Sequence, residues 1–421
     1  MMQTRANRAL IAAFAAVILL TGLPAGQALA QQPAVERDEK PSMMGERAYR
    51  RFEAVQNLYA DEKYQEALKN LNAMTDMALN DYEMAMAQQM YGYTYVALER
   101  YPEAVRAFEK AIQLDALPNQ AHFNLMRALA GLYASREEWQ KAIDTLTQYL
   151  RYQAEPTPQD QILMAQAYAQ MERWREALPW VQKAIAGAGP KAQESWYQLE
   201  VAAYFELGDY ASAADVLKRM VARWPGKLKY WEMLSGSYQQ SNRDTDALAA
   251  MMGAYHNGLI TEGSKLLSLA RMNMYLQLPY QAGSIIEEGM ASGAIPVTES
   301  NLELLLAAWT ASREYDKASA TIDRLAQMQD NGDLYIQKAN LKMEQNDWAG
   351  TVEAARQALD VGGLKNPGGA WLMMGIANME MGNLQEAKRA FRQAQQFDPD
   401  IRDQARDWEK FVEDRMQVAA R

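Results

Sequence analysis

The chain contains no cysteine among its 421 residues. This absence excludes disulfide bonds, thiolate metal sites, a cysteine nucleophile and a lipid-modified N-terminal cysteine. Histidine is nearly as scarce, because His122 and His256 are the only two. Neither histidine has an acidic partner at a metal-binding or catalytic spacing, so we interpret each as a surface or groove residue.

The short motifs that identify common enzyme classes are also missing. We find no phosphate loop, dinucleotide fingerprint, nucleophile elbow or zinc-binding histidine pair. Acidic pairs such as Glu287/Glu288 fall in segments with helical periodicity, where solvated charge is the ordinary interpretation. The sequence therefore predicts a protein that is not an enzyme and that carries neither a cofactor nor a metal site.

Strongly basic stretches are absent, and acidic residues outnumber basic ones by 53 to 43. This balance makes nucleic acid or anionic lipid a poor partner. The one long apolar run, residues 9–20, follows Arg5 and Arg8 and precedes Ala28-Leu29-Ala30, a small-x-small cleavage pattern. Since a membrane-spanning helix needs about 20 apolar residues, we predict a secretory signal peptide over residues 1–30, cleaved after Ala30.

Export would place the remaining chain in the periplasm, with secretion as the weaker alternative. Loss of the signal peptide would change the net charge from −10 to −12, because the segment holds two arginines and no acid. Residues 31–47 combine prolines and charges with little apolar surface, which predicts a flexible leader. No span of a membrane is predicted in the mature chain.

What the chain has in abundance is one recurring pattern. An aromatic residue, two further residues and an alanine are followed by apolar and small residues at helical spacing. Examples are Tyr64/Ala67, Tyr101/Ala104/Phe108/Ala111, Trp139/Ala142/Leu146, Trp174/Ala177/Val181/Ala184, Tyr210/Ala213/Leu217 and Tyr315/Ala318/Ile322. Alignment gives ten repeats that start near residues 48, 85, 123, 158, 194, 228, 264, 299, 332 and 368, about 36 residues apart on average.

The repeats resemble the tetratricopeptide repeat, whose period is about 34 residues. The last unit matches the family pattern best, with Trp371, Met374, Gly375, Ala387, Phe391, Ala394 and Pro399. The resemblance covers residues 48–398 and implies an all-α fold, an α-solenoid (superhelix) of about ten helix hairpins with a concave inner surface. Residues 399–421 carry apolar side chains at helical spacing, from Ile401 to Val412, and predict a C-terminal capping helix.

The last repeat also shows helix boundary signals. Gly382-Asn383 predicts a turn, with Asn383 and Glu386 as a capping box for the second helix. Asn366-Pro367 predicts the start of the first helix.

The inner surface of such a solenoid would be formed by the first helix of each repeat, where amides and aromatics prevail. These side chains can hydrogen-bond a peptide backbone and cover its apolar groups. Ordinary solvated helix surface is the alternative for each of them. The candidate partner-binding residues are Tyr93, Asn124, Arg127, Gln166, Gln170, Gln198, Phe205, Glu232, Gln239, Met272, Tyr275, Asn340, Met373 and Met379.

Methionine is frequent, with 26 residues and a dense group at Met373, Met374, Met379 and Met381. Such a group can fill a core, contact a protein partner or supply soft ligands to Cu(I). Met374 stands where the repeat consensus has leucine, which favours core packing, ahead of partner contact and of a metal site.

Three segments carry a finer resemblance: residues 206–251 (ELGDYASAADVLKRMVARWPGKLKYWEMLSGSYQQSNRDTDALAAM), 301–318 (NLELLLAAWTASREYDKA) and 362–383 (GGLKNPGGAWLMMGIANMEMGN). They are similar to exported tetratricopeptide-repeat proteins encoded beside TonB, ExbB and ExbD in Gram-negative bacteria. The resemblance implies a periplasmic scaffold, accessory to TonB-dependent outer-membrane uptake, that binds TonB, ExbB, ExbD or an outer-membrane component. The alternatives are a scaffold for outer-membrane protein assembly or polysaccharide export, and a methionine-rich metal-binding protein.

Overall fold

The computed structural model describes residues 36–152, 156–397 and 399–419. The predicted signal peptide and residues 31–35 of the predicted leader lie outside these ranges. The described residues form 21 α-helices, one short 3-10 helix and no strand, which confirms the all-α prediction. The chain divides into two compact units, Met1–Ala192 (unit 1) and Gln193–Arg421 (unit 2), each of which is described by itself.

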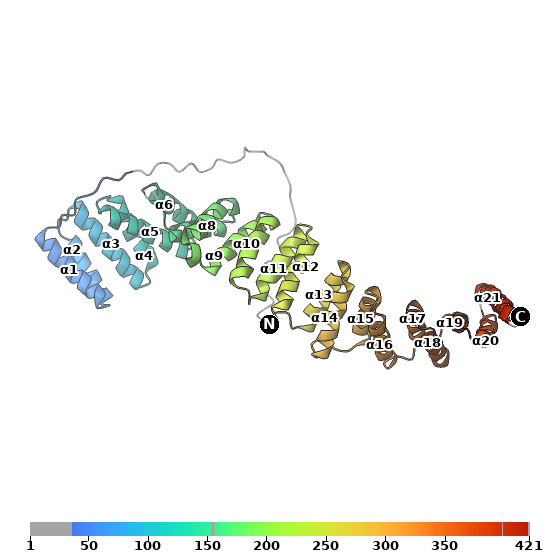
Figure 1. The fold of residues 1–421 in the computed structure, drawn as a ribbon. Helices are drawn as coiled ribbons and strands as arrows, with labels where there is room; N and C mark the ends of the chain where they lie inside the picture. Colours follow the sequence, from blue (N-terminus) through green and yellow to red (C-terminus); the bar gives the residue numbers. More distant parts are fainter. Residues whose placement is uncertain (1–35, 153–155, 398, 420–421) are drawn as a thin grey trace. The chain divides into compact units, whose positions relative to one another are not determined.

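Unit 1 consists of four helix hairpins. Their helices are α1 (Glu46–Ala60) and α2 (Tyr64–Thr75), α3 (Asp81–Ala97) and α4 (Tyr101–Gln113), α5 (Asn119–Ser135) and α6 (Trp139–Tyr152), and α7 (Pro158–Gln170) and α8 (Trp174–Ala188). The 3-10 helix η1 (Gly189–Lys191) follows α8. The second helix of each hairpin packs on the first helix of the next, so successive hairpins stack side by side (Figure 1).

Unit 2 repeats this arrangement six times and ends in one further helix. Its hairpins are α9 (Glu194–Glu206) and α10 (Tyr210–Arg223), α11 (Leu228–Gln240) and α12 (Asp244–His256), α13 (Gly263–Tyr275) and α14 (Pro279–Ala291), α15 (Glu299–Ala311) and α16 (Tyr315–Ala326), α17 (Gly332–Glu344) and α18 (Trp348–Val361), and α19 (Pro367–Glu380) and α20 (Leu384–Ala394). The last helix is α21 (Pro399–Ala419). Every first helix of the ten hairpins begins within four residues of a predicted repeat start, which confirms the ten-hairpin solenoid.

Small residues let the two helices of a hairpin approach each other closely. A Cβ atom added to Gly92 would lie 2.1 Å from the ring of Phe108, and one added to Gly375 would lie 2.4 Å from the ring of Phe391. In both hairpins the glycine is on the first helix and the aromatic ring on the second. The small-and-aromatic pattern of the sequence is therefore the packing contact within a hairpin.

Every hairpin turn contains one residue in the left-handed backbone region, with φ between 55° and 80°. A left-handed residue ends the first helix and reverses the chain within a few residues. These residues are Glu62, Glu99, Glu137, Glu172, Gly208, Asn242, Gln277, Arg313, Asn346 and Gly382. Eight of the ten are not glycine, so the turn geometry is imposed by packing rather than by residue type.

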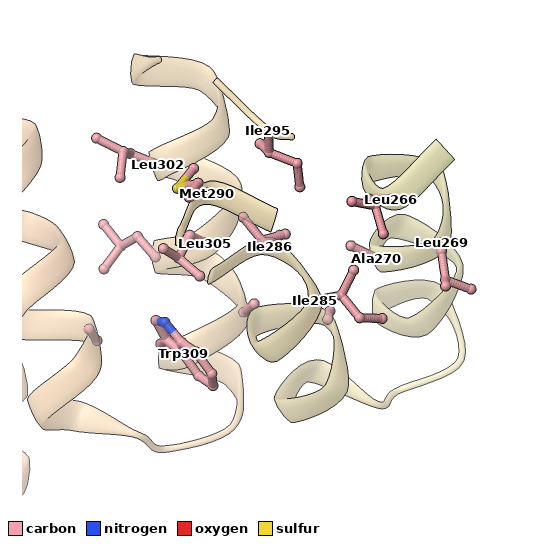
Figure 2. Packing of buried hydrophobic residues seen from close by; sticks show 14 of the residues in the cluster. Leu266, Leu269, Ala270, Ile285, Ile286, Met290, Ile295, Leu302, Leu305 and Trp309 are labelled. Carbon is pink, nitrogen blue, oxygen red and sulfur yellow. The ribbon is translucent and has the colours of Figure 1, made fainter. Parts of the chain in front are cut away.

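Neighbouring hairpins share apolar clusters that lie between them. Figure 2 shows a part of one cluster in unit 2, where side chains of α13, α14 and α15 interlock. Ile286 of α14 and Leu305 of α15 are fully buried there, and the Trp309 ring is nearly so. No hairpin buries its apolar face alone, which is why stacking stabilises the fold.

The helix boundary predictions have different outcomes. The side chain of Asn366 accepts a hydrogen bond from the main-chain nitrogen of Gly369 at 2.8 Å, which confirms the predicted helix start. The predicted capping box at Asn383 is wrong, because its side chain makes no capping hydrogen bond. Glu386 pairs instead with Arg389 at 2.9 Å.

Helix α21 covers the last hairpin. Ala405 and Val412 are fully buried in a cluster with Leu372 of α19 and Phe391 of α20. Trp408 is partly buried beside them. The predicted apolar stripe is thus the packing face of this helix. Among the residues that the structure describes, no helix has both the length and the apolar character of a membrane span.

Candidate partner-binding surface

We use the term open face for the solvent-exposed side of the first helices within one unit. In unit 1 this face contains Asn124 of α5 and Gln166 and Gln170 of α7, all of which are exposed. Tyr93 of α3 is partly buried, and its ring packs edge-on against Phe108 with 5.2 Å between the ring centroids. The side-chain oxygen of Asn124 already accepts a hydrogen bond from Gln120 at 3.2 Å, but its exposed amide and those of Gln166 and Gln170 can reach a ligand's backbone. Tyr93 is largely part of the hairpin core.

Arg127, the fifth candidate of unit 1, joins α5 to α7. Its Nε lies 2.6 Å from Oδ1 of Asp160, and the Asp160 side chain is buried. The other oxygen of Asp160 accepts hydrogen bonds from the Thr157 hydroxyl at 2.7 Å and the Thr157 main-chain nitrogen at 3.1 Å. Arg127 therefore compensates a buried carboxylate, a structural role that sequence alone does not reveal.

In unit 2 the open face runs over α9, α11, α13, α17 and α19. Gln198, Gln239, Tyr275 and Asn340 are exposed, Tyr275 to 72%. The partly buried candidates are Phe205, Glu232, Met272 and Met373. This row combines amide donors and acceptors with one projecting phenol ring, the chemistry that suits an extended peptide.

Met379 does not belong to this surface, and its prediction as a partner-contacting residue is wrong. Only 3% of the residue is exposed, because it packs in the cluster that Ala405 and Val412 of α21 complete. Met374 is buried in a different cluster, with Ala354 and Ala355 of α18, which confirms the core-packing interpretation for this methionine. The two buried thioethers thus fill separate cores. The described residues contain no group of three histidine, cysteine or acidic side chains that could hold a metal ion.

Polar contacts between consecutive first helices were missed by the sequence analysis. Lys227 lies 2.6 Å from Glu194, and Lys265 lies 2.6 Å from Glu232. The hydrogen bonds that the two lysines donate raise their pKa above the ordinary value. Each pair, like Arg127 and Asp160, is separated by 33 residues, close to one repeat. Opposite charges one repeat apart are therefore the signal that would have identified these pairs.

These contacts limit which candidates can bind a partner. Glu232 is committed to Lys265, and Gln198 donates a hydrogen bond to the Tyr230 hydroxyl at 2.7 Å. Gln239, Tyr275 and Asn340 remain as exposed candidates on unit 2. A separate open hollow of about 520 Å³ lies on α6 in unit 1, lined by Asp144, Thr147, Gln148, Arg151 and Tyr152.

This architecture agrees with the protein-family models that match the chain. Models of the tetratricopeptide repeat match residues 52–121, 90–160, 162–227, 199–258 and 368–401, together more than half of the chain. A comparison with curated proteins finds no match.

Solved structures with a similar fold include a tetratricopeptide repeat protein from Parabacteroides merdae, at 14% identity and a TM-score of 0.37 over 63% of this chain and 99% of that chain. MamA from Desulfovibrio magneticus is 19% identical, with a TM-score of 0.35 over 43% of this chain and 96% of that chain. YrrB, described as having an unusual peptide-binding site, is 15% identical, with a TM-score of 0.34 over 40% of this chain and 84% of that chain. On the family matches, this chain belongs to the tetratricopeptide-repeat family, whose stacked hairpins are scaffolds for protein–protein interaction.

Proposed function

We propose that the protein is a non-enzymatic adaptor that binds an extended segment of a protein partner along the open face of unit 2. The observation that carries this proposal is the set of exposed polar and aromatic side chains on three first helices of unit 2, Gln239 on α11, Tyr275 on α13 and Asn340 on α17. Amides can pair with a peptide backbone, and an exposed ring gives contact area at little entropic cost.

We further propose that the adaptor works in the periplasm and is accessory to TonB-dependent outer-membrane uptake. The basic start, apolar run and Ala28-Leu29-Ala30 pattern support export. The segments that resemble TonB-associated proteins, residues 206–251, 301–318 and 362–383, all fall in unit 2. The partner segment would therefore come from TonB, ExbB, ExbD or an outer-membrane component of this system.

A binding experiment with the purified chain and the periplasmic domain of TonB tests this function. We expect saturable binding at low salt that weakens about tenfold or more when Tyr275→Ala and Asn340→Ala are combined, since central aromatic contacts commonly contribute over 1 kcal/mol. Tyr101→Ala is the matched control, because this exposed tyrosine lies on a second helix. Absence of binding at high concentration and low salt would refute the TonB assignment, and an equal loss in the Tyr101 variant would refute the role of the open face.

A further inference from the structure

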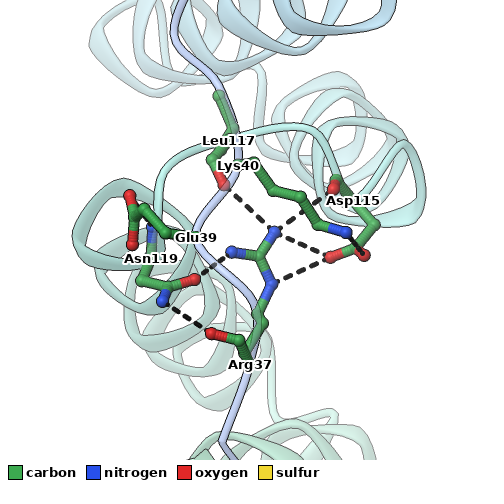
Figure 3. Close-up of polar contacts among 6 residues, drawn as sticks. All are labelled: Arg37, Glu39, Lys40, Asp115, Leu117 and Asn119. Carbon is green, nitrogen blue, oxygen red and sulfur yellow. Dashed lines mark hydrogen bonds and ion pairs between the residues drawn. The ribbon is translucent and has the colours of Figure 1, made fainter.

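The part of the predicted leader that the structure describes, residues 36–45, contacts unit 1 through a buried arginine (Figure 3). The Arg37 side chain is only 5% exposed. Its Nε and Nη2 donate hydrogen bonds to Oδ1 of Asp115 at 2.9 Å and 2.8 Å. Nη2 also donates to the main-chain carbonyls of Asp115 at 3.2 Å and Leu117 at 3.0 Å, and Nη1 donates to the side-chain oxygen of Asn119.

The residues around Arg37 are held by the same turn between α4 and α5. The side-chain nitrogen of Asn119 donates to the main-chain carbonyl of Arg37 at 2.9 Å. The main-chain nitrogen of Asn119, at the start of α5, donates to the Glu39 carboxylate at 3.3 Å. Lys40 lies 3.4 Å from the second oxygen of Asp115. The turn thus contacts Arg37, Glu39 and Lys40 of the leader.

A second anchor holds the end of the leader one hairpin earlier. The main-chain nitrogen of Gly45 donates to the buried Glu83 carboxylate at 2.7 Å, and Asn80 donates to the carbonyl of Met43 at 3.3 Å. Both anchors lie at the turns that join consecutive hairpins, before α3 and before α5. The leader therefore follows an edge of unit 1 that the open face does not include.

The chemistry of this turn matches a guanidinium group. Arginine presents five N–H donors in a planar fork, and the turn supplies a carboxylate, an amide oxygen and two main-chain carbonyls to them. Removing an arginine from water is costly unless most of its donors are paired. The composition that predicts a flexible leader gives no sign of this contact, because it depends on one side chain and on main-chain oxygens.

We propose that the α4–α5 turn, residues 114–119, is a peptide-recognition site for an extended Arg-x-acidic-Lys segment. The leader is its resident ligand, and a partner segment with the same pattern binds there by displacing the leader. A tethered ligand is present at high effective concentration, so the leader keeps the site closed to weak competitors. This second site goes beyond the proposed function, because it uses the turn edge of unit 1 and not the open face of unit 2.

Limited digestion with trypsin measures whether the leader occupies the site. Trypsin cleaves after arginine, and Arg37 is protected while its side chain is buried; Lys40 is followed by proline and resists cleavage in any state. We expect cleavage after Arg37 to become about tenfold faster or more in Asp115→Asn and in Asn119→Ala, since a hydrogen bond to a charged group contributes about 1.5–3 kcal/mol. Asp61→Asn is the control, because Asp61 is an exposed acid paired only with Lys63 nearby. Equal cleavage rates in all four chains would overturn the proposal.

A peptide with the sequence of residues 36–45 tests recognition in trans. We expect a fluorescent form of it to bind the full chain that carries Arg37→Ala, and to bind the unaltered chain about a hundredfold more weakly because the leader competes. The same peptide with alanine in place of Arg37 should bind neither chain. Failure of the arginine peptide to bind the Arg37→Ala chain, or equal binding of both peptides, would overturn the proposal. Neither result would alter TonB binding through Tyr275 and Asn340, so the two proposals fail separately.

Discussion

Two segments flank the repeats, and they differ in the kind of buried contact that attaches them. Residues 36–45 of the leader contact unit 1 mainly through polar groups, the buried guanidinium of Arg37, the Lys40 ammonium and main-chain hydrogen bonds, with Met44 as a partly buried apolar contact. Helix α21 contacts unit 2 through an apolar face on which Ala405 and Val412 are fully buried. Buried apolar area stabilises by about 25 cal/mol per Å² and adds up over a whole helix face, whereas the leader depends on a few hydrogen bonds to a charged group, each of which contributes about 1.5–3 kcal/mol. We therefore expect α21 to be an integral part of its unit and the leader to be exchangeable.

The largest loss of stability should come from a charge introduced on the face of α21 that packs against the last hairpin. Val412→Asp would bury an unpaired carboxylate between α21, α19 and α20, which we expect to cost about 3–5 kcal/mol. Because repeat arrays unfold locally, the last hairpin should lose structure first. Hydrogen exchange of the amides in α20 and α21 measures this, and we expect faster exchange there.

Val418→Asp is the matched control for this substitution. Val418 lies on the same helix but is 73% exposed, so the same new charge would remain solvated. If both variants exchange at the rate of the unaltered chain, α21 does not stabilise the last hairpin, and the contrast between the two flanking segments disappears.

The same contrast explains what could be predicted from the sequence. Helix α21 was predictable because Ile401, Ala405 and Val412 follow the helical period, and the ten hairpins because small and aromatic residues recur at one spacing. The docking of Arg37 was not, because a single arginine in a polar segment carries no periodic signal. Met379 was misplaced for a related reason: repeat register puts it at an inner-face position, but it is buried in the cluster that Ala405 and Val412 of α21 join.

The open face shows the same limit of prediction from the sequence. Repeat register places its residues on first helices, but it does not indicate which side chains are already engaged. Arg127 is paired with Asp160 and Glu232 with Lys265, whereas Tyr275 projects into solvent. Register thus predicts where a side chain lies, and contacts across repeats decide whether it is available.

The second prediction concerns acidic pH, which should destabilise unit 1, the unit that the leader contacts. The interpretation of His122 as a surface or groove residue is wrong, because it is buried beside the α4–α5 turn. Its Nδ1 has no hydrogen-bond partner in the described part of the chain. Burial and the positive charges of Arg37 and Lys40 lower the pKa of His122 from 6.5 to about 4, and Asp115 opposes this only in part. The unfolded chain therefore binds a proton more readily than the folded one, and stability falls as the pH drops from about 6.5 towards 4.

Denaturant unfolding of unit 1 at several pH values measures this loss, which we expect to reach about 3 kcal/mol at the acid end. His122→Gln should remove most of the slope between pH 6.5 and 4, whereas the exposed His256→Gln should leave it in place. Burial alone would raise the pKa of Asp115, but the hydrogen bonds and charges of Arg37 and Lys40 lower it below its ordinary 3.8, so loss of that ion pair belongs to a lower pH window. An unchanged slope in His122→Gln would contradict the assignment.

The smallest effects should come from the turns of the first and the last hairpin, which differ in residue type but not in backbone shape. Glu62 has φ 59° and Gly382 has φ 80°, so both occupy the left-handed region that glycine adopts without strain. We expect Glu62→Gly to stabilise unit 1 and Gly382→Ala to destabilise unit 2, each by about 1 kcal/mol, because a side chain in this region carries a penalty of that size. Denaturant midpoints measure both changes.

Asp61→Gly, one residue before Glu62 and at φ −79°, is the control and should not stabilise, since that backbone suits any residue. Opposite signs at Glu62 and Gly382 would show that a side chain in the left-handed region carries a similar penalty in both turns, and changes of the same sign would contradict this.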